Sequence, residues 1–168
     1  MEREGHIFVK NFFSLALISM IMLACSGCGG NSKMAIVSVQ PAMQQPYVFT
    51  VYSSGLMKVQ LCNFTTGDLR DSSYTADVSK ENDIQIAKDD LNEIKTLIDC
   101  VAKNSKEATQ PGIGDDTSEV HALISGKLYK SLFVRDYKNT TGASYENLLD
   151  KAVLDLSYKL IELSPMKV

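Results

Sequence analysis

Few residues of this 168-residue chain have side chains and spacings that could do chemistry. Its four cysteines are Cys25, Cys28, Cys62 and Cys100, and their spacing does not match a zinc-binding pattern. Lipid modification or disulfide formation is therefore the chemistry open to these thiols. The one histidine after residue 30 is His121. A hydrolase triad requires a nucleophile and an acid in contact with the histidine, and no sequence pattern links such residues to His121. We expect His121 to be a structural or a surface residue and predict no catalytic residue.

A stretch in the second half of the chain combines acidic residues with glycines. Asp115, Asp116 and Glu119 lack the alternating oxygen spacing of a calcium-binding loop. Gly112 and Gly114 do not lead into a helix with a lysine, as a phosphate-binding loop would. We therefore expect a solvated loop here, with no metal and no cofactor.

An apolar run, residues 12–24, leads directly to the first cysteine. Eleven of its thirteen residues are apolar, and only Ser14 and Ser19 interrupt it. A helix that spans a bilayer needs about 20 residues, whereas the hydrophobic region of a signal peptide has roughly 7 to 15. The run ends in Ala24, and Cys25 follows at once. This order of aliphatic residues, a small residue and a cysteine resembles the lipobox of bacterial lipoprotein signal peptides.

The resemblance implies that a lipid is attached to one cysteine, which becomes the first residue after cleavage. Cys25 is the preferred lipidation site, because it follows Ala24 and directly ends the apolar run. Cys28, preceded by Gly27, is the alternative. An ordinary signal peptide that is cut nearby and a buried core helix are the other interpretations of this segment.

The same resemblance divides the chain into three parts. Residues 1–24 would be a lipoprotein signal peptide, residues 25–33 a flexible tether with several glycines, and residues 34–168 a single domain. Several acyl chains hold a protein stably at a membrane, whereas one chain does so only marginally. The expected partner of the N-terminus is therefore the membrane. The expected location is the cell membrane, with the domain lipid-anchored on the extracytoplasmic side.

The remaining cysteines permit one disulfide. Cys62 lies at the end of a predicted strand and Cys100 on a predicted helix, so a disulfide between them is one interpretation outside the cytoplasm. Two free thiols that pack as small hydrophobic side chains are the alternative. If Cys25 carries the lipid, one thiol is left over in either case.

Composition limits the class of protein. The formal net charge is −3, and there is no run of lysine or arginine. Nucleic acid is not an expected partner, because phosphate binding needs clustered positive charge. Apolar residues make up 45% of the chain, which argues against wholesale disorder. The length after the leader is that of one ordinary domain.

The first half of the predicted domain is rich in strand signals. Residues 47–52 are aromatic and β-branched, and residues 56–62 alternate between apolar and polar side chains. Gly55 lies in the turn between them and can supply a positive φ, so the two segments predict a β-hairpin. We expect further short strands at 35–39 and 74–79.

Two helices and a second hairpin are predicted further along the chain. The first helix covers residues 88–103, because its apolar residues form one stripe: Leu91, Ile94, Leu97, Ile98 and Val101. The second hairpin has strands at 120–124 and 128–134. Ser144 is the expected N-cap of the second helix, which ends near Pro165. The apolar stripe of this helix is Leu148, Leu149, Ala152, Val153, Leu156 and Leu160.

This order of elements predicts the α+β class. Each helix has one apolar face, so the simplest fold is an antiparallel sheet of four to five strands with both helices on one face. The turns at Ser54–Gly55 and Ser125–Gly126 match, which permits an internal ββα-ββα repeat or a chance likeness. The other face of the sheet would then be exposed or used for binding.

Aromatic residues on the strands offer one candidate binding face. Core packing is their default role, but strand alternation allows some of Tyr47, Tyr52 and Tyr129 to point away from the helices. Exposed aromatic side chains are common in surfaces that bind proteins or glycans.

We expect this chain to be a non-enzymatic binding, inhibitory or envelope-assembly module anchored to the membrane. Its partner would be another envelope protein or a glycan. The alternative is an envelope enzyme or an enzyme accessory subunit. A site that converges on His121 would favour this alternative.

Overall fold

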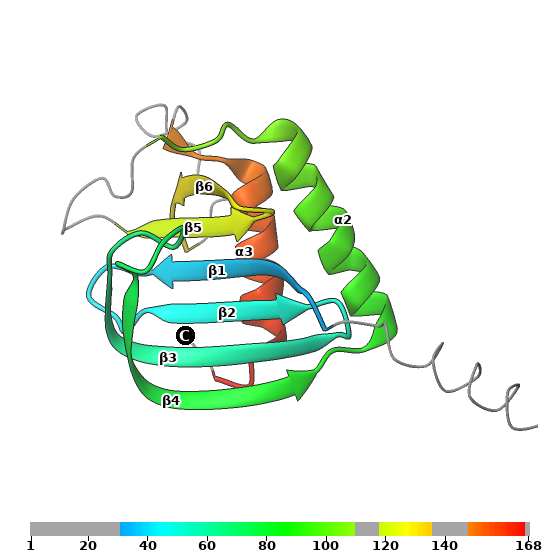
Figure 1. The fold of residues 1–168 in the computed structure, drawn as a ribbon, viewed down its shortest axis with the longest axis horizontal. Coiled ribbons are helices and arrows are strands. Elements are labelled where there is room, and N and C mark those ends of the chain that lie inside the picture. The colour runs from blue at the N-terminus through cyan, green and yellow to red at the C-terminus, as the bar shows by residue number, and fades with distance from the viewer. Residues whose placement is uncertain (1–30, 110–117, 136–147, 167–168) are drawn as a thin grey trace, which may run out of the picture. The chain divides into compact units, whose positions relative to one another are not determined.

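Six strands form one antiparallel sheet and two helices pack on it within residues 31–109, 118–135 and 148–166, which are those that the computed structural model describes (Figure 1). The strands are β1 (Lys33–Gln40), β2 (Tyr47–Tyr52), β3 (Leu56–Thr66), β4 (Thr75–Gln85), β5 (Glu119–Ile124) and β6 (Lys127–Leu132). The helices are α2 (Lys88–Asn104) and α3 (Lys151–Leu163). The strand order is β4-β3-β2-β1-β5-β6. The chain therefore has the predicted α+β class.

The described sheet is larger than the predicted four to five strands. Each described strand overlaps a predicted one, but β4 extends beyond the predicted 74–79 and pairs with β3 from Thr75 to Gln85, although most of its residues are exposed. A polar edge strand lacks the apolar alternation by which strands are recognised. The ββα-ββα repeat is not matched either, since four described strands precede α2 and only two lie between α2 and α3.

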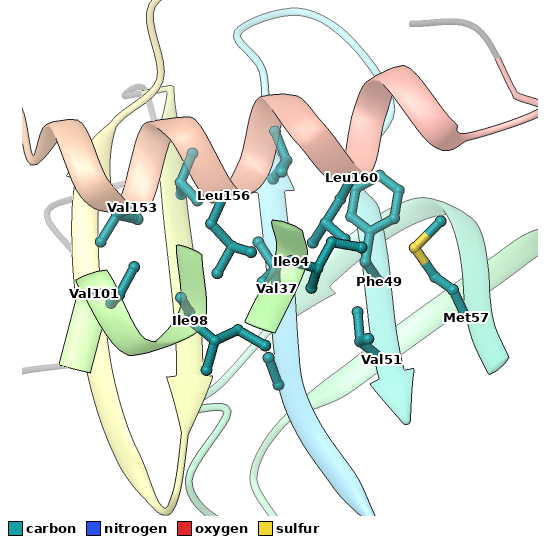
Figure 2. Close-up of a cluster of buried hydrophobic side chains, with 14 of the residues drawn as sticks. Val37, Phe49, Val51, Met57, Ile94, Ile98, Val101, Val153, Leu156 and Leu160 are labelled. Carbon is teal, nitrogen blue, oxygen red and sulfur yellow. The ribbon is translucent and has the colours of Figure 1, made fainter. Parts of the chain in front are cut away.

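Strand β1 lies at the centre because it pairs with both β2 and β5. The register sets Val37 opposite Phe49 on one side and opposite Ala122 on the other. Directly opposite residues share a face, so these side chains form one apolar layer. Both helices cover this layer, as Figure 2 shows for side chains from the two helices and three strands. Its members on α2 and α3 include Ile94, Ile98, Val101, Val153, Leu156 and Leu160.

The two helices begin differently. Helix α2 starts at Lys88, as predicted, and Asp89 and Asp90 in its first turn suit the helix dipole. Helix α3 starts at Lys151, and the Asp150 side chain caps it by accepting hydrogen bonds from two backbone N–H groups. The predicted cap, Ser144, lies outside the described residues. Leu148, predicted to belong to the apolar stripe, precedes the helix and is 52% exposed.

An ion-pair group joins the two helices. Lys159 Nζ on α3 lies 2.8 Å from Asp90 Oδ1 and 2.7 Å from Glu93 Oε2 on α2. Both carboxylates accept hydrogen bonds from the ammonium and raise the pKa of Lys159. The two helices therefore contact each other as well as the sheet.

Neither described helix combines the length and the apolar composition that crossing a membrane requires. The predicted signal peptide and the first part of the predicted tether lie outside the described residues.

Candidate functional site

The connection between β3 and β4 is a compact turn that we call the β3–β4 tip (residues 67–74). Its backbone closes on itself, because Asp71 N–H donates to the Asp68 carbonyl (3.2 Å) and Tyr74 N–H donates to the Asp71 carbonyl (3.4 Å). Side chains add to this, since Asp71 Oδ1 accepts from Ser73 N–H at 2.7 Å. Gly67 starts the turn with φ +83°, a conformation that side chains disfavour.

The β3–β4 tip lies over the sheet face opposite the helices (Figure 1). Arg70 Nη1 donates to the carbonyl of Ala108, which lies beside β6 (3.2 Å). Leu69 in the tip is buried, as are Ser38 on β1 and His121 on β5. Of the two expectations for this face, exposed or used for binding, an exposed face does not hold over β1 and β5, because the long, bulged β3–β4 hairpin folds back across it.

His121 and Glu119 form a buried pair on β5. They are two residues apart, so both side chains point to the same face of the strand. His121 Nε2 lies 2.6 Å from Glu119 Oε2. Burial lowers the pKa of His121, and the neighbouring carboxylate of Glu119 only partly opposes this effect. A neutral ring must donate through Nε2 to a carboxylate, which assigns its tautomer.

A second pair lies in the tip itself. Arg70 Nη2 is 2.5 Å from Asp68 Oδ2, and Arg70 Nε donates to Asp68 Oδ1 at 3.0 Å. This fork-like contact is the strong geometry for an arginine and a carboxylate. It lowers the pKa of Asp68 and raises that of Arg70. The tip therefore presents a paired carboxylate to the sheet.

Lys130 on β6 completes the cluster. It stands directly opposite His121 in the β5–β6 register, so the two side chains share this face. Burial lowers the pKa of Lys130, and the charges of Glu119 and Asp68 act against that effect. When His121 is neutral, the negative charges of Glu119 and Asp68 balance the positive charges of Lys130 and Arg70. We call these five residues the covered polar cluster.

Two hydroxyl groups lie beside the covered polar cluster. Ser38 on β1 stands directly opposite His121 in the β1–β5 register. Among the described residues, its Oγ and the hydroxyl of Tyr74 are the buried side-chain polar atoms without a hydrogen bond. Burial raises the pKa of Tyr74, while Ser38 and Thr65 beside it act in the opposite direction.

Serine, histidine and glutamate in this order resemble the parts of a hydrolytic triad. Here, however, Ser38 makes no hydrogen bond to His121, and Ser38 is fully buried. The prediction of no catalytic residue rested on the lack of a partner for His121, and the structure supplies one in Glu119. The alternation Glu119-x-His121 on a strand was the available signal. The proximity of Ser38 depends on strand pairing, which the sequence does not show.

The structure corrects the predicted aromatic face. Tyr47 and Tyr129 are buried in the core under the helices, and the Tyr47 ring stacks on Phe49 with centroids 6.2 Å apart. Only Tyr52 remains half-buried on the opposite face, near Lys58. The register is the reason, because Tyr47 and Tyr129 fall on the positions that face the helices.

The structure does not bring Cys62 and Cys100 together, and both are free thiols. Cys62 is fully buried near Tyr74 and Asp77, on the side of the sheet that carries the tip, and burial raises its pKa. Cys100 is half-buried on α2, where its sulfur accepts a hydrogen bond from Asn104.

The other predicted sites are not described. Cys25 and Cys28 lie outside the described residues, as do Asp115 and Asp116. Within the described ranges, no group of three or more His, Cys, Asp or Glu side chains could hold a metal ion.

Among the described residues, three of the four large hydrophobic side chains that are exposed lie in the β3–β4 hairpin and in the β1–β2 connection. In the described part of the chain, the large hydrophobic residues that are exposed are Met43, Phe64, Val78 and Leu148. Phe64 and Val78 belong to the hairpin that carries the tip. Met43 lies in the β1–β2 connection, which is tied to β3 by a hydrogen bond from Cys62 N–H to the Pro46 carbonyl (2.9 Å).

Comparisons with protein-family models, curated proteins and solved structures find no match to this chain. Its function must therefore be argued from its own residues.

Proposed function

We propose that this chain is a lipoprotein of the bacterial cell envelope, anchored to the membrane through Cys25, and that its domain binds another envelope protein without catalysing a reaction. The apolar run that ends at Ala24 and Cys25 supports the anchor. The first strand begins at Lys33, so only a short tether would separate the domain from the lipid.

One observation carries the binding role. Met43, Phe64 and Val78 are exposed and come from two connected parts of the fold, the β1–β2 connection and the β3–β4 hairpin. Single exposed apolar residues are ordinary, whereas a contiguous exposed apolar patch marks an interaction surface. We propose that these three side chains contribute to such a patch. We call these three residues the apolar group.

The position of the apolar group suits an anchored domain. Strand β1 runs from Lys33, where the tether joins, to Gln40, which leads into the connection that holds Met43. At about 3.3 Å per residue, this strand separates the two ends by roughly 25 Å. The start of β1, to which the anchor would be joined, and the apolar group therefore lie at opposite ends of β1. We propose that anchoring leaves the apolar group accessible.

The anchor is tested by the intact mass of the protein from the membrane fraction. We expect the lipid mass to be lost in Cys25→Ala and kept in Cys28→Ala. Loss only in Cys28→Ala would move the lipidation site to Cys28. An unprocessed protein without lipid would overturn the anchor.

The binding role is tested by photo-crosslinking in cells. A photoreactive amino acid is placed at Phe64 in one variant and at Leu148, which is equally exposed (52%), in the control. We expect a discrete adduct with one protein from position 64 and not from position 148. The absence of any adduct at 64, or the same adducts at both positions, would contradict the assigned surface.

The second candidate function is that of an envelope enzyme, which the grouping of Ser38, His121 and Glu119 favours. A serine activated by a histidine–carboxylate pair reacts with fluorophosphonates. Labelling of the intact protein at Ser38 that is lost in His121→Gln would support this function. An unlabelled Ser38, which its burial leads us to expect, would leave the binding role as the better proposal.

A further inference from the structure

The β3–β4 tip is held together by hydrogen bonds among its own residues. Its own hydrogen bonds include Asp68 N–H to Ser73 Oγ (3.2 Å) and Arg70 N–H to Asp68 Oδ1 (2.9 Å). Its contacts with the rest of the domain include the hydrogen bond from Arg70 to Ala108, the buried side chains of Asp68 and Leu69, and the buried hydroxyl of Tyr74. Residues 70–73 are exposed.

The hairpin also contains places where it can bend. The β3–β4 register is interrupted between Leu61 and Cys62 and again between Cys62 and Phe64. Such bulges disrupt the ladder and bend the strands locally. The tip and the body of the sheet are therefore connected through an irregular segment.

Charged groups from three elements face His121 beneath the tip. Glu119 comes from its own strand, Lys130 from β6, and Asp68 from the tip, where Arg70 holds it. The neighbour on β1 is Ser38, which carries no charge. Tyr74 lies beside Ser38, and Cys62 lies near Tyr74; burial raises the pKa of both side chains, so both are neutral.

A proton on His121 changes the charge balance of this covered site. With the ring neutral, Glu119 and Asp68 offset Lys130 and Arg70. A proton adds a positive charge directly opposite Lys130, in a place where burial already disfavours charge. Lifting the tip would admit water to the imidazolium and relieve this cost.

We propose that the β3–β4 tip is a pH-sensitive strap, closed over β5 and β6 when His121 is neutral and released when His121 takes up a proton. Release would also move the hairpin that carries Phe64 and Val78. This release requires neither the lipid anchor nor a particular partner.

Hydrogen exchange of the full-length protein at pH 7.5 and pH 5.0 tests the strap. Protection of peptides covering the tip is corrected for the intrinsic pH dependence of exchange and compared with peptides from β2. We expect protection of the tip to fall about tenfold or more at pH 5.0, since one unit of pKa difference corresponds to a factor of ten. The β2 peptides should stay protected.

His121→Gln is the matched variant, because its amide can still donate to Glu119 but never gains a charge. We expect its tip to stay protected at pH 5.0. Lys130→Met removes the charge opposite His121 and should reduce the effect of pH in the otherwise unchanged chain. Equal protection at both pH values, an unchanged loss in His121→Gln, or a simultaneous loss of protection in β2 would each overturn the strap.

Discussion

The His121 imidazole and the Glu119 carboxylate are joined through Nε2 and Oε2 at 2.6 Å, and both residues are more than nine-tenths buried. The pair lies on a strand face that the helices leave free but that the β3–β4 tip covers. A titratable ring in such a place couples protonation to folding.

Acidification should therefore destabilise the protein through His121. The pKa of His121 is lower in the folded protein than the unfolded value of about 6.5. Stability from this residue is thus fully present above the unfolded pKa and is lost as pH falls toward the folded pKa. Urea unfolding between pH 7 and pH 5 should show a slope of at most about 1.4 kcal/mol per pH unit from this one proton. His121→Gln should flatten the slope, and an equally steep slope in that variant would exclude this assignment.

The core between the sheet and the helices should be sensitive to truncation. Leu156 on α3 is fully buried, so Leu156→Ala removes packed methyl groups and leaves a cavity. We expect a loss of about 2 to 5 kcal/mol in the free energy of unfolding, measured with urea. Leu148→Ala is the control, since Leu148 is half exposed and should change stability by less than about 0.5 kcal/mol. Similar losses in both variants would show that Leu148 also packs in the core.

Two glycines with nearly the same positive φ provide a matched comparison. Gly67 has φ +83° and Gly126 has φ +79°. A Cβ on Gly126 would meet no atom within 4 Å, so Gly126→Ala should cost only about 1 to 2 kcal/mol for the left-handed conformation. A Cβ on Gly67 would clash with the Ser73 carbonyl oxygen, so Gly67→Ala should lower the free energy of unfolding more and should disturb the tip. Urea unfolding measures the loss in free energy of unfolding for each variant. A larger loss in Gly126→Ala than in Gly67→Ala would contradict this structure of the tip.

The thiols should differ in reactivity. Cys100 is half-buried and should be alkylated by iodoacetamide in the native protein, as located by peptide mass mapping. Cys62 is fully buried and its pKa is raised, so its thiolate is scarce and it should react only after unfolding in urea. If neither thiol reacts in urea until a reductant is added, the two form a disulfide and the free-thiol structure is wrong.

Much of the fold could be read from local patterns. The first hairpin, the start of the first helix at Lys88 and the second hairpin follow from alternation and stripe periodicity, which are properties of neighbouring residues. Where apolar and polar residues did not alternate clearly, the predicted strand was too short. Strand β4 is polar along most of its length, and only its pairing with β3 identifies its full extent to Gln85.

The candidate site depended on relations between distant residues. The chain itself determined that Glu119 and His121 share one face of a strand, because alternate residues of a strand must do so. The chain also determined that the candidate reactive side chains are the cysteine thiols and His121, the one histidine in the predicted domain.

Only the tertiary structure decided which face each strand residue occupies. Strand pairing set Ser38 and Lys130 opposite His121, and it turned Tyr47 and Tyr129 toward the helices. The fold of a long hairpin brought Asp68 over the same face, more than fifty residues away along the chain. The physical reason is that alternation tells which residues lie together on a strand, whereas the face they occupy depends on register and on what the rest of the chain packs against it.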